Sequence, residues 1–351
     1  MKKSATMLAL AAGGMSIAHG IAMAQSNVTI YGYLDAAVAS ERGGAAGQVT
    51  KVASSVAAPS RLGFHGEEDL GSGVTAIFNL ETGIALDTGG FTGSAVFGRT
   101  DYVGLRGGYG TLRLGNLRTA IYETMILVAD PMANGHAGQA GNLMTGGVVG
   151  GPTSPGGRGN FRGNTVAYTS PVLGGFGVEL DYSAGEAAGD ASKSRSIGGA
   201  FGYSAGRLST RLAWLSSMDA NGIDSATNTL WGANYNFGPA TGFVAYGRNK
   251  GYAKADNREY LVGAAVPFGL HKVMLSYIRK DDKSAVDNDG HQIGVAYVYA
   301  LSKRSSLFAS YARIGQNAAR TSPAFYSINI GAPGIAGGGD KAFTLGVSHF
   351  F

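Results

Sequence analysis

Polar and apolar residues alternate along many short stretches of the chain, and this alternation is the strongest structural signal in the sequence. Near the N-terminus, Ile30 and Leu34 alternate with polar or aromatic neighbours, and the same period recurs over 178–182 and 343–351. Residues two apart on a β-strand point to the same face, so each stretch predicts a strand with one apolar and one polar face. Beyond the first 24 residues the pattern never switches to a helical period, which predicts a single all-β domain.

The alternation predicts sixteen strands, joined by connections that are short and long in turn. The short connections are rich in Gly, Pro and Ser, which suits tight turns, whereas the long ones include 40–59, 119–161 and 316–340. An even number of strands with short turns at one end and long loops at the other is typical of transmembrane β-barrels. We expect the strands at 28–39, 60–70, 73–84, 97–107, 110–118, 162–170, 176–184, 195–203, 207–218, 228–237, 241–249, 258–266, 271–280, 290–299, 306–315 and 341–351.

Backbone hydrogen bonding requires such strands to close on themselves. Lipid cannot satisfy an open sheet edge, so membrane-spanning strands must form a ring, and a ring of sixteen is too wide for side chains to fill. We therefore expect an antiparallel transmembrane barrel with a water-filled lumen. The alternative is a soluble sandwich or propeller. The chain ends, however, in an alternating strand at Phe351, and an aromatic final residue on the apolar face is typical of a barrel-assembly signal.

The N-terminal segment 1–24 is predicted to be a signal peptide. Lys2 and Lys3 precede apolar and small residues, and residues 22–24 (Ala-Met-Ala) fit the cleavage pattern, so the mature barrel domain is expected to span 25–351. A short membrane anchor is the alternative, but polar residues interrupt the apolar run. Removal of 24 residues from 351 leaves 327, or about 20 for each strand and connection, which accommodates a ~10-residue membrane-spanning strand.

Charge and composition narrow the functional classes. Cleavage would lower the count of Lys and Arg from 28 to 26 against 23 acidic residues, so the net charge would fall from +5 to +3. This mild excess, with no basic run of five or more, disfavours nucleic acid as a partner. The chain has no cysteine, so an exported form must be stabilised by backbone pairing and packing. No sequence motif indicates a cofactor or a metal site.

Several segments resemble the Gram-negative porin family, particularly its betaproteobacterial branch. They are 28–35 (VTIYGYLD), 60–71 (SRLGFHGEEDLG), 98–105 (GRTDYVGL), 110–115 (GTLRLG) and the closing 346–351 (GVSHFF). Each motif is weak by itself, but their order and spacing are specific and cover the whole mature chain. The resemblance implies a homotrimer in the outer membrane, with outer-membrane lipid, lipopolysaccharide and the barrel-assembly machinery as partners. It also implies a third long loop folded into the lumen, and passive diffusion of small polar solutes and ions.

Arginines on the predicted strands are candidates for the basic side of a pore constriction. The family carries an arginine ladder on these strands, and its motifs carry over best to Arg61 on the second strand and Arg99 on the fourth. Arg113 lies on the fifth strand between two leucines, and Arg158 and Arg162 compete for a further place near the sixth. Arginine suits the role because it stays charged while solutes pass. The alternative for each is a solvated lumen or rim residue.

The loop 119–161 is the candidate for the opposite, acidic side of the constriction. A structureless stretch of this length is usually functional, and its apolar start argues against full solvent exposure. Its carboxylates are Glu123 and Asp130. Between residues 99 and 162 there are six arginines against three acidic residues. We therefore expect a channel that prefers anions, because rings of charged side chains set ion preference. A surface loop at a subunit contact is the alternative.

Four other functions are less well supported by the sequence: a soluble enzyme, a membrane hydrolase, a channel specific for one solute and an adhesin. The sequence has no P-loop, no G-x-G-x-x-G, no H-E-x-x-H and no G-x-S-x-G, so no soluble-enzyme motif is present. A membrane hydrolase could use His291 beside Asp287 and Asp289, although a solvated loop histidine is far more common. A channel specific for one solute, or an adhesin using the loops 40–59 and 316–340, also remains open. The sequence therefore predicts a non-enzymatic diffusion channel.

Overall fold

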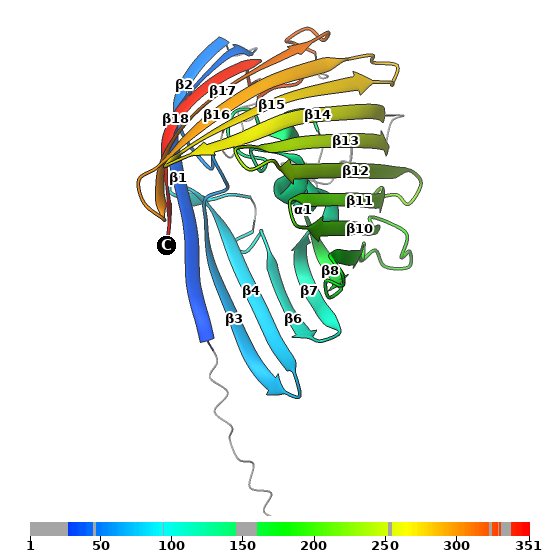
Figure 1. The fold of residues 1–351 in the computed structure, drawn as a ribbon. Helices are drawn as coiled ribbons and strands as arrows, with labels where there is room; N and C mark the ends of the chain where they lie inside the picture. The colour runs from blue at the N-terminus through cyan, green and yellow to red at the C-terminus, as the bar shows by residue number, and fades with distance from the viewer. Residues whose placement is uncertain are drawn as a thin grey trace, which may run out of the picture.

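The computed structural model describes residues 27–44, 47–93, 95–144, 160–251, 255–322, 325–328, 330 and 338–351, and the predicted signal peptide 1–24 lies outside them. Within these ranges the chain is almost entirely β-structure (Figure 1). The strands are β1 (Asn27–Gly44), β2 (Gly47–Ser54), β3 (Arg61–Gly71), β4 (Val74–Ala85), β5 (Gly90–Phe91), β6 (Asp101–Gly107), β7 (Gly110–Arg118), β8 (Phe161–Thr169), β9 (Phe176–Ser183), β10 (Ser196–Ala205), β11 (Leu208–Met218), β12 (Ser225–Asn236), β13 (Thr241–Gly251), β14 (Ala255–Phe268), β15 (His271–Asp282), β16 (Gly290–Ala300), β17 (Ser305–Gln316) and β18 (Lys341–Phe350).

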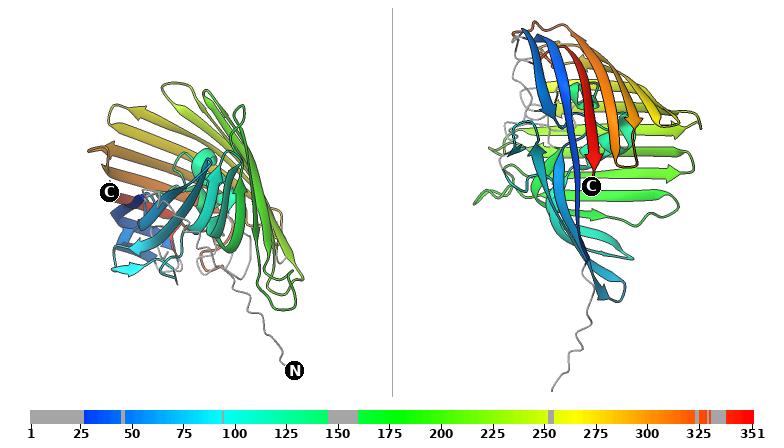
Figure 2. Two further views of the ribbon diagram at one scale, coloured as in Figure 1. Left: turned by 90° about the horizontal axis from the view of Figure 1, so that it is seen from below. Right: turned by 90° about the vertical axis from the view of Figure 1, so that its left-hand side faces the viewer.

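Sixteen of these strands pair in sequence into a closed antiparallel ring. The ring runs β1, β3, β4, β6 and then β7 to β18, and β18 returns to pair with residues 33–42 of β1. Figure 2 shows β18 in red beside the blue strands of the chain start. The two extra strands are local additions, because β2 folds back on the far half of β1 and β5 pairs only with the end of β4. The predicted sixteen-stranded barrel is confirmed.

The distribution of side chains is that of a soluble protein turned inside out. On the outward face of the strands Val262 is 55% exposed and Leu345 is 57% exposed, whereas the inward Gln292 and Thr344 are fully buried. A soluble β-sandwich buries its apolar face between two sheets, so this arrangement excludes the soluble alternative. Among the described residues, no helix is long and apolar enough to cross a membrane.

Two of the predicted long loops contain regular structure. The range 40–59 continues β1 as far as Gly44 and then forms β2. The described part of 119–161 is not structureless. It contains the short helix α1 (Ala120–Thr124), one π-helical turn (Met125–Ala129) and one 3₁₀ turn (Ala140–Asn142). Side-chain hydroxyls support this local winding, since Thr119 accepts a hydrogen bond from the N–H of Tyr122 as the N-cap of α1.

The fourth predicted strand begins later than expected. It was predicted at 97–107, but β6 begins at Asp101, so Arg99 precedes the strand instead of lying on it. The physical reason is that the backbone carbonyls of residues 99 and 100 accept hydrogen bonds from side chains instead of from a neighbouring strand. The amide of Asn116 donates to the carbonyl of Arg99 at 2.6 Å, and the amide of Asn79 donates to the carbonyl of Thr100. These two amides fix the Arg99 backbone in an irregular segment above the strand.

The C-terminal residue locks the seam between the first and last strands. Phe351 exchanges two backbone hydrogen bonds with Gly32, at 3.1 and 3.2 Å, and its ring covers that glycine. A Cβ atom at position 32 would lie only 2.2 Å from a ring carbon of Phe351. A glycine is therefore required for the aromatic ring to lie flat on the outer surface of β1.

Substituting Gly32→Val should expel the Phe351 ring and weaken closure of the barrel. Overpacking of this kind costs about 1–3 kcal/mol. The expected result is a smaller fraction of heat-resistant folded barrel on an unheated denaturing gel. Gly202→Val is the matched control, because a Cβ at that strand glycine meets nothing closer than 3.7 Å. Equal folded fractions for the two variants would contradict a locking role for Phe351.

Candidate functional site

Three arginines surround the buried carboxylate of Glu81 on the inner wall of the barrel. The Nε atom of Arg99 lies 2.6 Å from Oε1 of Glu81, and the Nε atom of Arg61 lies 3.3 Å from Oε2. Arg118, the last residue of β7, lies 4.0 Å from the same carboxylate through Nη2. The hydroxyl of Tyr31 donates to Glu81 at 3.0 Å. One negative charge therefore holds three positive charges together, and we call these residues the Glu81 cluster.

The arginines of the Glu81 cluster are also held by aromatic rings. The guanidinium carbon of Arg61 lies 5.5 Å from the centre of the Tyr33 ring, and that of Arg99 lies 5.2 Å from the centre of Phe161. Cation–π contacts of this kind orient a guanidinium without neutralising it. The cluster is thus a rigid group with an excess of positive charge.

A second carboxylate, Glu179 on β9, organises the neighbouring part of the wall. Nη2 of Arg211 lies 2.5 Å from Oε2 of Glu179, and Nη2 of Arg113 lies 3.8 Å from Oε1. Arg211 also lies 3.6 Å from the carboxylate of Glu123, which comes from α1 of the long loop, and donates to the hydroxyl of Thr124. These contacts define the Glu179 cluster, in which the loop meets the strand wall.

The acid–base state of Glu123 is unusual for a carboxylate. Its burial and the nearby carboxylate of Glu179 raise its pKa to about 7, although Arg113 and Arg211 lower it. The charge of the Glu179 cluster therefore changes near neutral pH.

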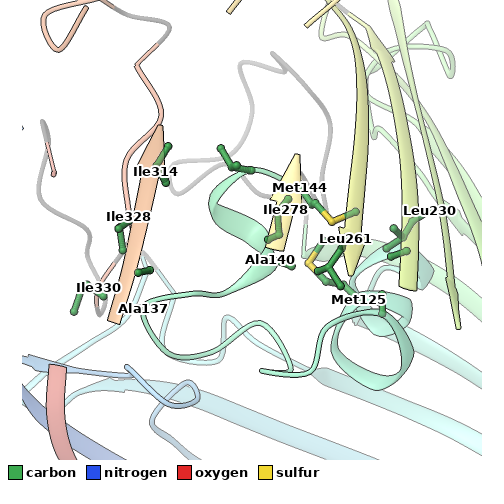
Figure 3. Packing of buried hydrophobic residues seen from close by; sticks show 14 of the residues in the cluster. Met125, Ala137, Ala140, Met144, Leu230, Leu261, Ile278, Ile314, Ile328 and Ile330 are labelled. Atoms are coloured by element: carbon green, nitrogen blue, oxygen red, sulfur yellow. The ribbon is translucent and has the colours of Figure 1, made fainter. Parts of the chain in front are cut away.

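The described part of the long loop runs along the inner wall, from α1 beside β9 to β12 as far as β17. A cluster of buried apolar side chains joins it to the strands, with Met125, Ala140 and Met144 from the loop packed near Leu230 and Leu261 (Figure 3). Inward-facing side chains also donate to loop carbonyls: Asn234 to Val128, Ser276 to Gly138, Lys280 to Leu143, and Gln292 to Gly138. The start of the loop thus meets the arginines at the Glu179 cluster, whereas its later part lies on strands away from the Glu81 cluster.

Inward-facing glycines make room for the loop. A Cβ at Gly232 would lie 2.8 Å from Cβ of Ala129, and a Cβ at Gly294 would lie 2.7 Å from Cα of Gly138. A Cβ at Gly263 would likewise lie 2.7 Å from Pro131. Close approach of two backbones requires residues without side chains, so these strand glycines allow the loop to lie flat on the wall.

Asp130 fixes the conformation of the loop through hydrogen bonds to the loop backbone. Its carboxylate accepts hydrogen bonds from the backbone N–H groups of Met132, Asn134 and Ala140, each at 2.9 Å. Burial raises its pKa to about 6, even though these three N–H groups lower it. Close by, burial lowers the pKa of His136 to about 4, so that ring is neutral at pH 7. Among the described residues, no cationic side chain lies within 4.0 Å of Asp130.

The predicted site residues therefore lie in separate places, and their grouping was not predicted from the sequence. Arg61 and Arg99 meet at Glu81, while Arg113 and Glu123 meet at the Glu179 cluster. Asp130 is taken up by its own loop instead of facing an arginine. The two candidates near the sixth strand differ: Arg162 donates to the hydroxyl of Ser217, and Arg158 lies outside the described residues.

Sequence reasoning did not select four residues of the two clusters: Glu81, Arg118, Glu179 and Arg211. A signal for one of them existed. Glu179 lies between Val178 and Leu180 on a predicted strand, and this alternation puts it on the inward face. The pairing between strands, which brings Glu179 of β9 near Arg211 of β11, is not visible in a single strand.

A closed ring of sixteen strands, apolar outside and charged inside, defines a β-barrel membrane channel. Residues 5–319 match the sequence profile of the Gram-negative porin, and the chain therefore belongs to the Gram-negative porin family. It is an outer-membrane porin. Members of this family are passive channels, so the interpretation as a membrane hydrolase is set aside.

Individual relatives match either the whole chain or a part of it. Outer membrane porin protein 32 of Delftia acidovorans is 35% identical, with all of both chains covered. The major outer membrane protein P.IB of Neisseria gonorrhoeae is 34% identical over 56% of this chain and 53% of its own. Among solved structures, the anion-selective porin from Comamonas acidovorans superposes with a TM-score of 0.80 at 30% identity, covering 93% of this chain and all of the other.

Proposed function

We propose that this porin is a passive diffusion channel with a preference for anions, and that its constriction lies between the long loop and the two arginine clusters. The observation that best supports this proposal is the positive charge of that part of the wall. The ion pairs of the two central carboxylates bring together five arginines (61, 99, 113, 118 and 211) and three carboxylates (Glu81, Glu123 and Glu179). With the adjacent Asp101, Asp181 and Arg162 included, six arginines stand against five carboxylates, so the wall keeps a positive excess. Fixed positive charge in a narrow aqueous neck raises the local anion concentration.

Two further observations support this proposal. The loop segment 119–144 contacts inward-facing residues of every strand from β11 to β17, through hydrogen bonds and packing. A loop held in this way narrows the lumen beside the arginines. In addition, the similar porin from Comamonas acidovorans is described as anion-selective.

The test is single-channel recording of the purified protein in a planar bilayer, with a KCl gradient across it. We expect large, ohmic conductance steps and a reversal potential whose sign indicates chloride preference. A clear cation preference would overturn the anion proposal while leaving the pore itself intact. Conductance that is absent from a correctly folded barrel would overturn the diffusion channel.

Acidification is expected to strengthen the anion preference, because the pKa of Glu123 lies at about 7. The carboxyl is charged above this pH and takes up a proton below it, so between pH 8 and pH 6 the Glu179 cluster loses negative charge. Reversal potentials measured across this interval should shift towards chloride. In E123Q the shift should be smaller, because only groups such as Asp130, with a pKa of about 6, still take up protons in this interval. A shift of equal size in E123Q would assign the titration to another group.

We also propose the assembly and export of the chain. Cleavage after residue 24 would produce a mature chain beginning at Gln25. Three copies would then form a homotrimer in contact with lipopolysaccharide, with Phe351 read by the barrel-assembly machinery. A solved structure of the same fold, OmpT of Vibrio cholerae, is described as a trimer form. Conductance steps that occur in groups of three, together with the mass and N-terminal sequence of the purified protein, would test these points.

A further inference from the structure

Two arginines lie side by side on the outer surface of the barrel, near its long-loop end. Arg248 of β13 and Arg258 of β14 are both exposed, and they share the outward phase of Val244 and Val262, which belong to the lipid-facing surface. β13 ends at Gly251 and β14 begins at Ala255, so both arginines lie a few residues from this end of the barrel. In barrels of this class, the end that carries the long loops faces the cell exterior. They have no part in the lumen.

The strand register places these two like charges directly opposite each other. Arg248 and Arg258 are a cross-strand pair, and neither guanidinium has a carboxylate within 4.0 Å in the part of the chain that the structure describes. Like charges in this position destabilise a sheet. On its other side Arg258 is opposite an acidic residue, Asp281 of β15, but that carboxylate pairs with Arg279 at 2.8 Å, and Asp256 pairs with Lys250 at 3.4 Å. An excess of positive charge therefore remains on this surface.

Aromatic side chains form a row immediately below the arginines, on the same outward face. Trp231 of β12 is opposite Tyr246 of β13, which in turn is opposite Tyr260 of β14. The two tyrosine rings lie 5.3 Å apart, and Trp231 and Tyr260 are each 40% exposed. Such amphipathic rings mark the level of lipid headgroups. The arginines, two residues further along their strands, therefore lie at or just above the headgroups of the outer leaflet.

We propose that Arg248 and Arg258, above the row of Trp231, Tyr246 and Tyr260, bind the phosphorylated headgroup of an outer-leaflet lipid. A guanidinium fork matches the geometry of phosphate oxygens and binds them in bidentate fashion. One phosphate between the two arginines would convert their repulsion into attraction. The acyl chains would lie against the outward Val244 and Val262, which are 43% and 55% exposed.

The occupant is a lipid rather than a free anion, because the arginines and the apolar strip form one continuous surface. A free phosphate would use the two guanidinium groups alone and would gain nothing from the aromatic row. A second copy of the chain would need acidic groups to face the pair.

The test is binding of bis-phosphorylated lipid A to the delipidated porin in detergent, followed by native mass spectrometry. The wild type should retain the lipid, and R248Q/R258Q should bind it about tenfold more weakly or not at all. R248K/R258K should fall between them, because lysine keeps the charge and loses the fork. K303Q/R304Q, in a short turn at the opposite end, removes the same charge and should bind like the wild type.

Three results would overturn the proposal. Undiminished binding of lipid A by R248Q/R258Q would place the lipid elsewhere. Equal competition by inorganic phosphate or equal binding of dephosphorylated lipid A would show that headgroup and chains are not recognised together. A change in the oligomeric state of R248Q/R258Q would make the pair a subunit contact. Heat-resistant mobility on an unheated gel verifies that every variant is folded.

Discussion

A channel in which Arg61 and Arg99 are both replaced by glutamine is expected to lose its anion preference and to favour cations. Glu81 accepts its two shortest ion pairs from these residues, at 2.6 and 3.3 Å, and the remaining Arg118 lies 4.0 Å away. Removing two positive charges leaves the buried carboxylate with only one cationic partner within the described ranges, Arg118, and the neutral hydroxyl of Tyr31. Reversal potentials in a KCl gradient should change sign, and the ratio of chloride to potassium permeability should fall about tenfold.

Two matched variants separate this local effect from net charge. E81Q should shift the reversal potential in the opposite direction, towards stronger chloride preference, because it leaves three arginines without their central carboxylate. R248Q/R258Q removes the same two charges from the outer surface and should leave the ion preference unchanged. If R61Q/R99Q kept the selectivity of the wild type, the Glu81 cluster could not be the selective part of the pore.

Replacing Asp130 by alanine is expected to release the long loop from its fixed shape. The carboxylate accepts three backbone N–H groups, at 2.9 Å each, and the side chain is almost fully buried. Each N–H left without an acceptor in a buried position costs about 1–3 kcal/mol, so the loop would rearrange to find other acceptors. Single-channel traces should then show excess noise and spontaneous closures, and proteases should cut the loop more readily.

The barrel should tolerate this change, because its strands pair with one another independently of Asp130. Thermal unfolding of D130A is therefore expected near the wild-type temperature, whereas the open-channel noise rises. D130N retains one carbonyl acceptor and should lie between the two. Quiet wild-type currents from folded D130A would show that the apolar cluster and the bonds from Lys280 and Gln292 suffice to hold the loop.

The strands were largely predictable because each is specified by its own residues. The predicted strand at 110–118 coincides with β7, and the predicted strand at 176–184 differs from β9 by one residue. Exposed apolar and buried polar side chains alternate on a strand whatever its neighbours are. The prediction failed where side chains replaced the backbone ladder, as at Arg99, whose carbonyl accepts from Asn116.

The candidate site was only partly predictable, since contacts across the wall depend on the register between strands. Arg61 and Arg99 were selected, but Glu81, which joins them, was not. Asp130 was expected to face the arginines because it is one of only two carboxylates in its loop. In the structure, the carboxylate of Asp130 accepts hydrogen bonds from backbone N–H groups of its own loop, because the following ten residues wind around it.

The sequence by itself determined the strands and their inward and outward faces, because a period of two is a property of each segment alone. It also determined a closed ring with a polar interior, because lipid cannot satisfy the backbone groups of an open sheet edge. Tertiary structure alone decided which inward charges meet. The gathering of Arg61, Arg99 and Arg118 at Glu81, the contact of Glu123 with Arg211, and the outward pairing of Arg248 with Arg258 all depend on strand register and on the path of the long loop. These are relations between segments distant in the chain, and no single segment encodes them.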